Sequence, residues 1–161
     1  EKQFPDKVFI NVAERKATSI TLANVNGKTV PVQIDKNGVI FAVDRGMPVN
    51  SVPLVTGFTF DTIAEGMRLN GKFRPLMEQI SEIQSTNPAY LSVLSEIKVV
   101  PNDYGSYELE LFPVHSRVKV LADRTLNIES LQYMMVALDV IHSLKSDVSV
   151  INLRHGSISY K

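Results

Sequence analysis

The chain has 161 residues, and its 17 Lys and Arg balance 17 Asp and Glu, so the formal net charge is zero. This length suits one hydrophobic core rather than two full domains. A neutral chain has no basic field with which to bind nucleic acid or an anionic membrane surface. The absence of cysteine excludes disulfides, thiolate metal sites and thiol nucleophiles. No apolar stretch is long enough to cross a bilayer, and the start at Glu1 with no leader suggests a piece of a longer protein.

Alternating apolar residues predict strands in the first quarter of the chain. Residues 8–13 form the first such pattern, after a turn-forming Phe-Pro-Asp. Residues 20–34 predict a hairpin, because Asn26 and Gly27 tolerate the left-handed backbone of a tight turn. Residues 39–43 are a continuous apolar run, which is typical of a strand covered on both faces.

Two helices are predicted further along. Residues 44–57 are rich in turn formers and predict an irregular surface connection. Apolar residues at three- and four-residue steps then predict a helix over residues 73–83, with Pro75 in its first turn. A longer helix is expected to begin after Asn127 as its N-cap and to end near Lys145. Its expected apolar stripe is Leu131, Met134, Met135, Leu138, Ile141 and Leu144. Five more strands are expected over residues 96–100, 107–112, 117–121, 148–153 and 157–160.

These elements predict an α+β fold, with a mostly antiparallel sheet and two main helices packed on one face. Tyr107, Leu109 and Leu111 alternate with Glu108 and Glu110, so we expect the other face of the sheet to be wet. The two glutamates are therefore expected to be solvated rather than to form an acid/base pair.

Motifs that would carry chemistry are incomplete. Residues 66–73 have the glycine and lysine spacing of a phosphate-binding loop, but Phe73 stands where a magnesium-binding hydroxyl is needed. The residues before this motif look helical, whereas a phosphate loop follows a buried strand. His115, His142 and His155 are far apart and have no carboxylate at zinc-ligand spacing. We therefore expect no catalytic residue, no metal site and no cofactor.

The last predicted strand, residues 157–160, lies at the very end of the chain, and terminal strands commonly form sheet edges. An unpaired edge offers N–H and C=O groups that an extended partner segment can complete. The alternative is a strand that is paired internally or blunted by Lys161, and the sequence leaves both open.

Five segments, in order along the chain, resemble motifs of the extracytoplasmic part of the FtsQ/DivIB family of bacterial cell-division proteins. FPDKVFINVAER is similar to the strand that closes the family's small POTRA domain, and VQIDKNGVIF is similar to a hairpin of its β domain. PLVTG, SEI and INLR match three further motifs at residues 53–57, 95–97 and 151–154. Two local departures are Asn152 in place of the usual Asp and Ala122 in place of a Gly.

The resemblance implies that residues 1–17 are the final strand of a truncated POTRA-like domain with its joint, and that residues 18–161 are the β domain. It implies a place on the extracytoplasmic, periplasmic face of the cytoplasmic membrane, with a single-pass anchor upstream of this chain. It also implies a non-enzymatic scaffold of the division machinery that binds partners of the FtsL and FtsB (DivIC) type through its last strands.

The resemblance also places the partner-facing positions around the last turn. We hypothesise that the terminal strand accepts a partner strand by main-chain hydrogen bonding. Arg154 is expected to pair with an acidic partner residue, and Ile158 or Tyr160 to supply apolar burial. The expected partner-binding residues are Arg154, His155, Gly156, Ser157, Ile158 and Tyr160.

Two other functions remain open from the sequence. One is a binding module of another envelope assembly factor that also carries POTRA-like domains, which predicts a further domain or barrel downstream. The other is a hydrolase or nucleotide-dependent enzyme that uses residues 66–73 or the scattered histidines.

Overall fold

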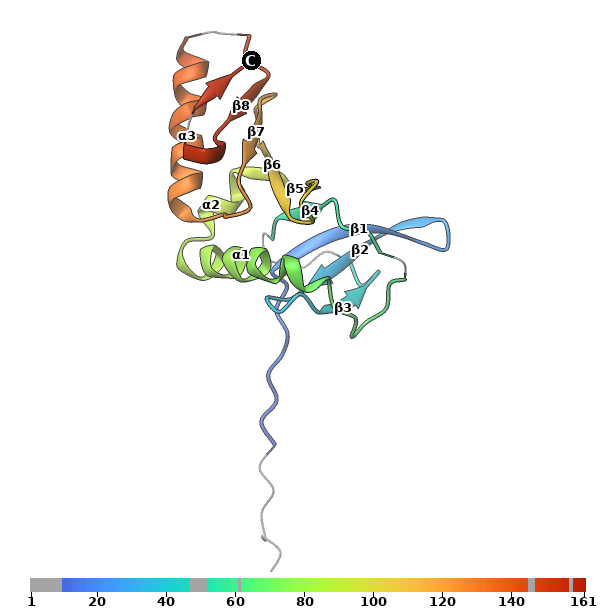
Figure 1. Cartoon of the computed structure of the whole chain (residues 1–161). Coiled ribbons are helices and arrows are strands. Elements are labelled where there is room, and N and C mark those ends of the chain that lie inside the picture. Colours follow the sequence, from blue (N-terminus) through green and yellow to red (C-terminus); the bar gives the residue numbers. More distant parts are fainter. Residues whose placement is uncertain (1–9, 47–51, 61, 145–146, 157) are drawn as a thin grey trace, which may run out of the picture.

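The computed structural model describes residues 10–46, 52–60, 62–144, 147–156 and 158–161. They form one nine-stranded sheet in the order β3-β2-β1-β4-β5-β6-β7-β8-β9 (Figure 1). The strands are β1 (Ser19–Val25), β2 (Lys28–Ile34), β3 (Ile40–Val43), β4 (Leu54–Thr56), β5 (Leu94–Pro101), β6 (Tyr107–Pro113), β7 (Lys119–Ala122), β8 (Val150–Asn152) and β9 (Ser159–Tyr160). The helices are α1 (Arg74–Thr86), α2 (Ala89–Ser92) and α3 (Ile128–Ser143), and the short 3-10 turns are η1 (Gly71–Phe73) and η2 (Arg154–Gly156).

The predicted fold class is confirmed. Five of the eight strand pairings are antiparallel, and the parallel ones are β1 with β4, β4 with β5, and β7 with β8. The buried stripes of α1 and α3 join the inward-facing strand residues in one core, so both main helices cover the same face of the sheet. The wet face is also confirmed, since Tyr107, Leu109 and Leu111 are buried while the glutamates between them are partly exposed.

The predicted hairpin forms as expected. β1 and β2 pair over their whole length, and Asn26 and Gly27 turn the chain between them with φ of 53° and 79°. Positive φ at both positions gives the turn the twist that matches the flanking strands. At the next turn, the carboxylate of Asp35 accepts the N–H groups of Asn37 and Val39, each at 2.9 Å.

The prediction of an irregular connection over residues 44–57 is wrong at its end. Leu54–Thr56 forms β4, which lies between β1 and β5 and runs parallel to both. Val55 at its centre is fully buried. Three residues between Pro53 and Gly57 are too few to show a periodicity, so the turn formers around them dominate the sequence pattern.

The prediction that residues 39–43 are covered on both faces is also wrong. β3 is the first strand of the sheet, and its residues alternate between buried and partly exposed. Its outer backbone is bonded by a neighbouring segment, because the N–H of Ile40 donates to the Met67 carbonyl at 2.8 Å and the N–H of Gly66 donates to the Ile40 carbonyl at 2.7 Å. The N–H of Leu69 adds a bond to the Gly38 carbonyl at 2.8 Å. This edge of the sheet is therefore sealed.

The sealing segment overlaps the motif that resembles a phosphate-binding loop. Its backbone groups serve β3 rather than a phosphate, and the side chain of Phe73 is buried in the core. The described residues before Gly66 form turns and extended chain, so the expectation that they are helical is wrong. Phe58, Phe60 and Ile63 in this irregular stretch are partly buried against the core.

The strand expected over residues 8–13 does not appear in its described part, and residues 8 and 9 lie outside the described residues. Residues 10–17 form no strand and run away from the sheet as an extended segment (Figure 1). Ile10 and Val12 are 79% and 88% exposed. A strand needs a neighbour for its backbone groups, and none of the described strands lies beside this segment.

Helix α3 begins as predicted. The Asn127 side chain accepts the N–H of Ser130 at 2.8 Å, and the Ser130 hydroxyl accepts the N–H of Asn127 at 3.1 Å, which is a reciprocal capping box. Of the predicted apolar stripe, Met135 and Leu144 are exposed, contrary to expectation. Met135 lies on the flank of the stripe, and Leu144 lies past the end of the helix. The buried stripe is Leu131, Met134, Leu138 and Ile141.

Candidate functional site

The terminal strand β9 is an edge strand. It is the last in the sheet order and, among the described strands, pairs only with β8, in antiparallel orientation. Ile151 lies opposite Tyr160, and Asn152 lies opposite Ser159. The edge position expected from the sequence is therefore confirmed, although the strand has only two residues and Ser157 lies outside the described residues.

The pairing register determines which backbone groups of the edge point outward. Val150 and Lys161 exchange two hydrogen bonds of 3.0 Å, so they form a hydrogen-bonded pair. In an antiparallel ladder, bonded and non-bonded positions alternate. Tyr160 and Ile158 therefore direct their N–H and C=O groups away from β8. These are the groups that an added strand would meet, and no other strand of the described chain lies beside them.

A shallow apolar groove of about 240 Å³ lies between the edge and helix α3. Ile158 and Tyr160 form its strand side. Its helix side is a second apolar stripe, spaced by three or four residues, which lies next to the core stripe and meets it at Ile141. The exposed members of this outer stripe are Tyr133, Val136, Val140 and Leu144, which are 47–70% exposed. The helix thus leaves apolar surface uncovered beside the last strand of the sheet.

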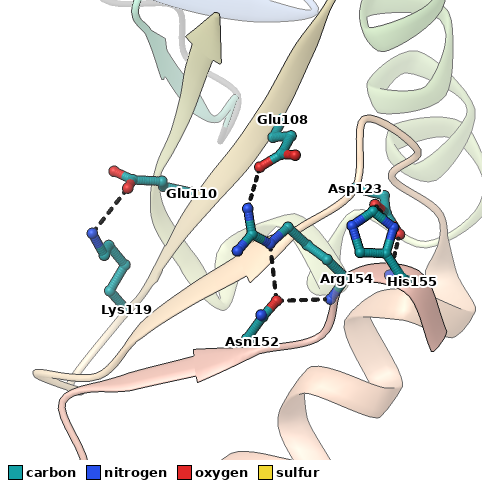
Figure 2. Close-up of polar contacts among 7 residues, drawn as sticks. All are labelled: Glu108, Glu110, Lys119, Asp123, Asn152, Arg154 and His155. Atoms are coloured by element: carbon teal, nitrogen blue, oxygen red, sulfur yellow. Dashed lines mark hydrogen bonds and ion pairs between the residues drawn. The ribbon is translucent and has the colours of Figure 1, made fainter. Parts of the chain in front are cut away.

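Arg154 makes its described side-chain contacts with residues of its own chain. Its guanidinium pairs with the carboxylate of Glu108, and its Nε donates to Asn152 Oδ1 at 3.0 Å (Figure 2). The backbone N–H of Arg154 donates to the same Asn152 oxygen at 3.1 Å. An acidic partner residue at this position would have to share Arg154 with Glu108. Asn152 keeps the acceptor oxygen that the usual Asp of the motif would provide.

His155 adopts a left-handed backbone with φ of 60° and is followed by Gly156 at 67°. Its N–H donates to Asp123 Oδ2 at 2.9 Å, and its Nδ1 lies 3.6 Å from the other oxygen of that carboxylate (Figure 2). A non-glycine residue at positive φ is uncommon, so this contact supports the reversal between β8 and β9. The imidazole itself is 78% exposed.

Sequence reasoning missed Glu108 and Asp123, which contact the last turn from β6 and from the connection after β7. Alternation places Glu108 on the wet face, but nothing local pairs it with a residue 46 positions later. Only the sheet order brings the two residues together, because Arg154 follows β8 and reaches across β7 to β6.

Glu110, next on the same face of β6, accepts from Lys119 Nζ at 2.9 Å and lies 3.5 Å from Lys98 Nζ. The hydrogen bond from Lys119, with the positive charges of both lysines, lowers the pKa of the Glu110 carboxyl. A carboxyl with a folded-state pKa below its unfolded value stabilises the fold at higher pH, and this contribution is lost as the pH falls through the folded-state pKa.

We therefore predict that Glu110→Gln flattens the dependence of stability on pH. Between neutral pH and about pH 3, the variant should lose less unfolding free energy than the wild type, because it lacks one carboxylate that must be protonated. Urea unfolding at several pH values measures this difference. Identical pH profiles for the two proteins would contradict the assignment.

The other candidate residues are not brought together. Within the described part of the chain, no three His, Asp or Glu side chains lie close enough to hold a metal ion. Among the same residues, no helix is both long and apolar enough to span a membrane. Residues 66–73 are engaged in sealing β3 and in the core, as described above.

No protein-family model matches the sequence, and no curated protein matches it either.

Proposed function

We propose that this chain is a non-enzymatic scaffold domain of the bacterial division machinery that binds partners of the FtsB/DivIC and FtsL type by accepting a strand at β9. The family part of the proposal is supported by the five motifs in FtsQ/DivIB order. The binding mode is supported by one observation: β9 is the last strand of the sheet, and its Ile158 and Tyr160 line an apolar groove together with exposed residues of helix α3.

An added strand would contact both the outward backbone groups of the β9 edge and the outer apolar stripe of α3. Its backbone would pair with the outward N–H and C=O groups of Ile158 and Tyr160. Every second side chain of the added strand would face the outer stripe of α3. Burial of a side chain the size of Val or Leu contributes roughly 1.5–3 kcal/mol, which together with the main-chain hydrogen bonds opposes the cost of association and of ordering the partner.

The contrast between the two ends of the sheet supports the same proposal. At β3, a segment of the chain itself bonds the outer backbone. At β9, the outer backbone faces no other strand among the described residues, and apolar side chains lie beside it. Proteins commonly blunt or cover their edge strands, so an edge with an adjacent apolar groove fits a docking site.

The proposed setting follows from the resemblance. The domain would lie on the extracytoplasmic side of the cytoplasmic membrane, held by a single-pass anchor upstream of this chain. Its partners would then be other membrane proteins of the division machinery, whose extended segments reach the β9 edge.

A proline at Tyr160 tests strand addition. Tyr160→Pro removes one outward N–H and the aromatic side chain, whereas Tyr160→Ala removes the side chain alone. We expect Tyr160→Pro to bind about tenfold more weakly than Tyr160→Ala, because a ladder hydrogen bond contributes about 1 kcal/mol and proline also strains the added pairing. Calorimetry with the purified extracytoplasmic region of the FtsB/DivIC-type protein from the same genome measures this.

The thermal midpoints of both variants serve as the folding control, since β9 lies outside the core. Equal affinity of Tyr160→Pro and Tyr160→Ala would rule out main-chain pairing at this edge. Failure of the wild-type chain to bind the probe would rule out the proposed partner class.

A further inference from the structure

The attachment of β9 to the sheet is short. The strand has two residues, which pair with two residues of β8, and Lys161 after it exchanges two hydrogen bonds with Val150. Pairing of this length is marginal by itself in water. The contacts of the preceding turn therefore decide how firmly the edge is held.

The first of these contacts comes from β6. Glu108 pairs with Arg154, whose Nε and backbone N–H both bond to Asn152 (Figure 2). The side chains of Glu108 and Arg154 are 32% and 28% exposed, so the pair is partly shielded from water. A charge-assisted bond in such a place is stronger than one on an open surface. It ties the start of η2 to a strand in the interior of the sheet.

The second contact comes from the connection between β7 and α3. Asp123 accepts the N–H of His155 at 2.9 Å, at the residue whose backbone is left-handed. The backbone of the reversal is thus held at the point where it departs from ordinary geometry. The two contacts engage successive residues of the turn from different elements.

We infer that Glu108 and Asp123 are positioning residues that hold the last turn and so keep β9 in place as the docking edge. Neither belongs to β9. Arg154 acts through Glu108 in this arrangement, as an internal brace rather than as a contact to an acidic partner. The effect on the fold of the free chain stands alone, whereas the effect on binding rests on the proposed function.

Amide exchange on the free chain tests directly whether Glu108 and Asp123 hold β9 in place. In Glu108→Ala and in Asp123→Ala, the exchange of the Lys161 and Val150 amides, which pair β9 with β8, should be about tenfold faster than in the wild type. Glu110→Ala is the matched control, because Glu110 lies on the same face of the same strand and has its own ion pairs but does not contact the turn. It should leave these two amides unchanged.

The amides of the core strands serve as the reference for global stability, and urea unfolding of each variant measures that stability independently. If the exchange of Lys161 in Glu108→Ala and Asp123→Ala is as slow as in the wild type, the inference is wrong. It is also wrong if the amides of the core strands accelerate to the same extent as Lys161, since the two residues would then support the whole fold and not the edge.

Binding of the same FtsB/DivIC-type probe provides the second readout. Glu108→Ala should weaken binding about tenfold, and Glu110→Ala should not change it. Arg154→Ala in the Glu108→Ala background should cause no further loss if Arg154 acts through Glu108. A further loss in the double variant would show a direct contact of Arg154 with the partner and overturn its role as a brace. If the wild type does not bind the probe, the proposed function fails, while the exchange experiment still decides the inference.

Discussion

Replacement of Gly57 by alanine is expected to lower the free energy of unfolding by about 4 kcal/mol, since it combines backbone strain with a clash in the sheet. Gly57 follows β4 and has φ of +87°. A Cβ at this position would lie 2.0 Å from the carbonyl oxygen of Val99 in β5. A backbone oxygen within a ladder cannot move aside without breaking that ladder, so β4 and β5 would have to separate. Urea denaturation followed by circular dichroism measures the loss.

Gly66 provides the matched control. Its φ is +91°, close to that of Gly57, but a Cβ there would meet no atom within 4 Å. Gly66→Ala should therefore cost about 1 kcal/mol, which reflects the strain of a left-handed alanine alone. Equal losses in the two variants would show that the contact with Val99 does not govern the effect.

The two apolar stripes of α3 should separate stability from binding. Leu131 is fully buried in the core stripe, and Leu131→Ala is expected to reduce the unfolding free energy by about 3 kcal/mol, because it leaves a cavity. Val136 is 60% exposed in the outer stripe. Val136→Asp should change stability by about 0.5 kcal/mol or less. It should nevertheless weaken binding of the FtsB/DivIC-type probe at least about tenfold, because it places a charge opposite the apolar side of the added strand.

Met135 serves as the control for this binding effect. It is an exposed apolar residue of the same helix but does not line the groove beside β9. Met135→Asp should leave the affinity unchanged. Unaltered binding by Val136→Asp, or an equal loss in Met135→Asp, would remove the groove from the docking site.

The sequence predicts well those parts of the fold that depend on local pattern. The hairpin around Asn26 and Gly27 and the start of α3 at Asn127 follow from turn and capping chemistry within a few residues. β4 could not be predicted, because a three-residue strand between parallel neighbours is defined by the strands beside it. The sealed side of β3 depends likewise on a segment about 25 residues further along the chain.

The candidate site divides in the same way. That the last strand forms an edge could be expected from its place in the chain, and the alternation of Ile158 and Tyr160 indicated its apolar side. The contacts of Arg154 could not be expected from the sequence, because a guanidinium group can pair with any carboxylate, whether it belongs to a partner or to the same chain. Only the order of β6, β7 and β8 brings Glu108 within its reach. The outer stripe of α3 was likewise hidden, since the sequence does not show which apolar residues of a helix the sheet leaves uncovered.

The sealed backbone of β3 limits how copies of this domain can associate. Open-ended association through sheet edges requires two free edges on every molecule. Here the β3 edge is already bonded by residues of the same chain. Self-association through β9 would thus stop at a twofold dimer instead of growing into a fibre. Such a dimer would compete with the proposed partner strand for the same backbone groups, so each molecule would bind either a second copy or one partner strand at this edge.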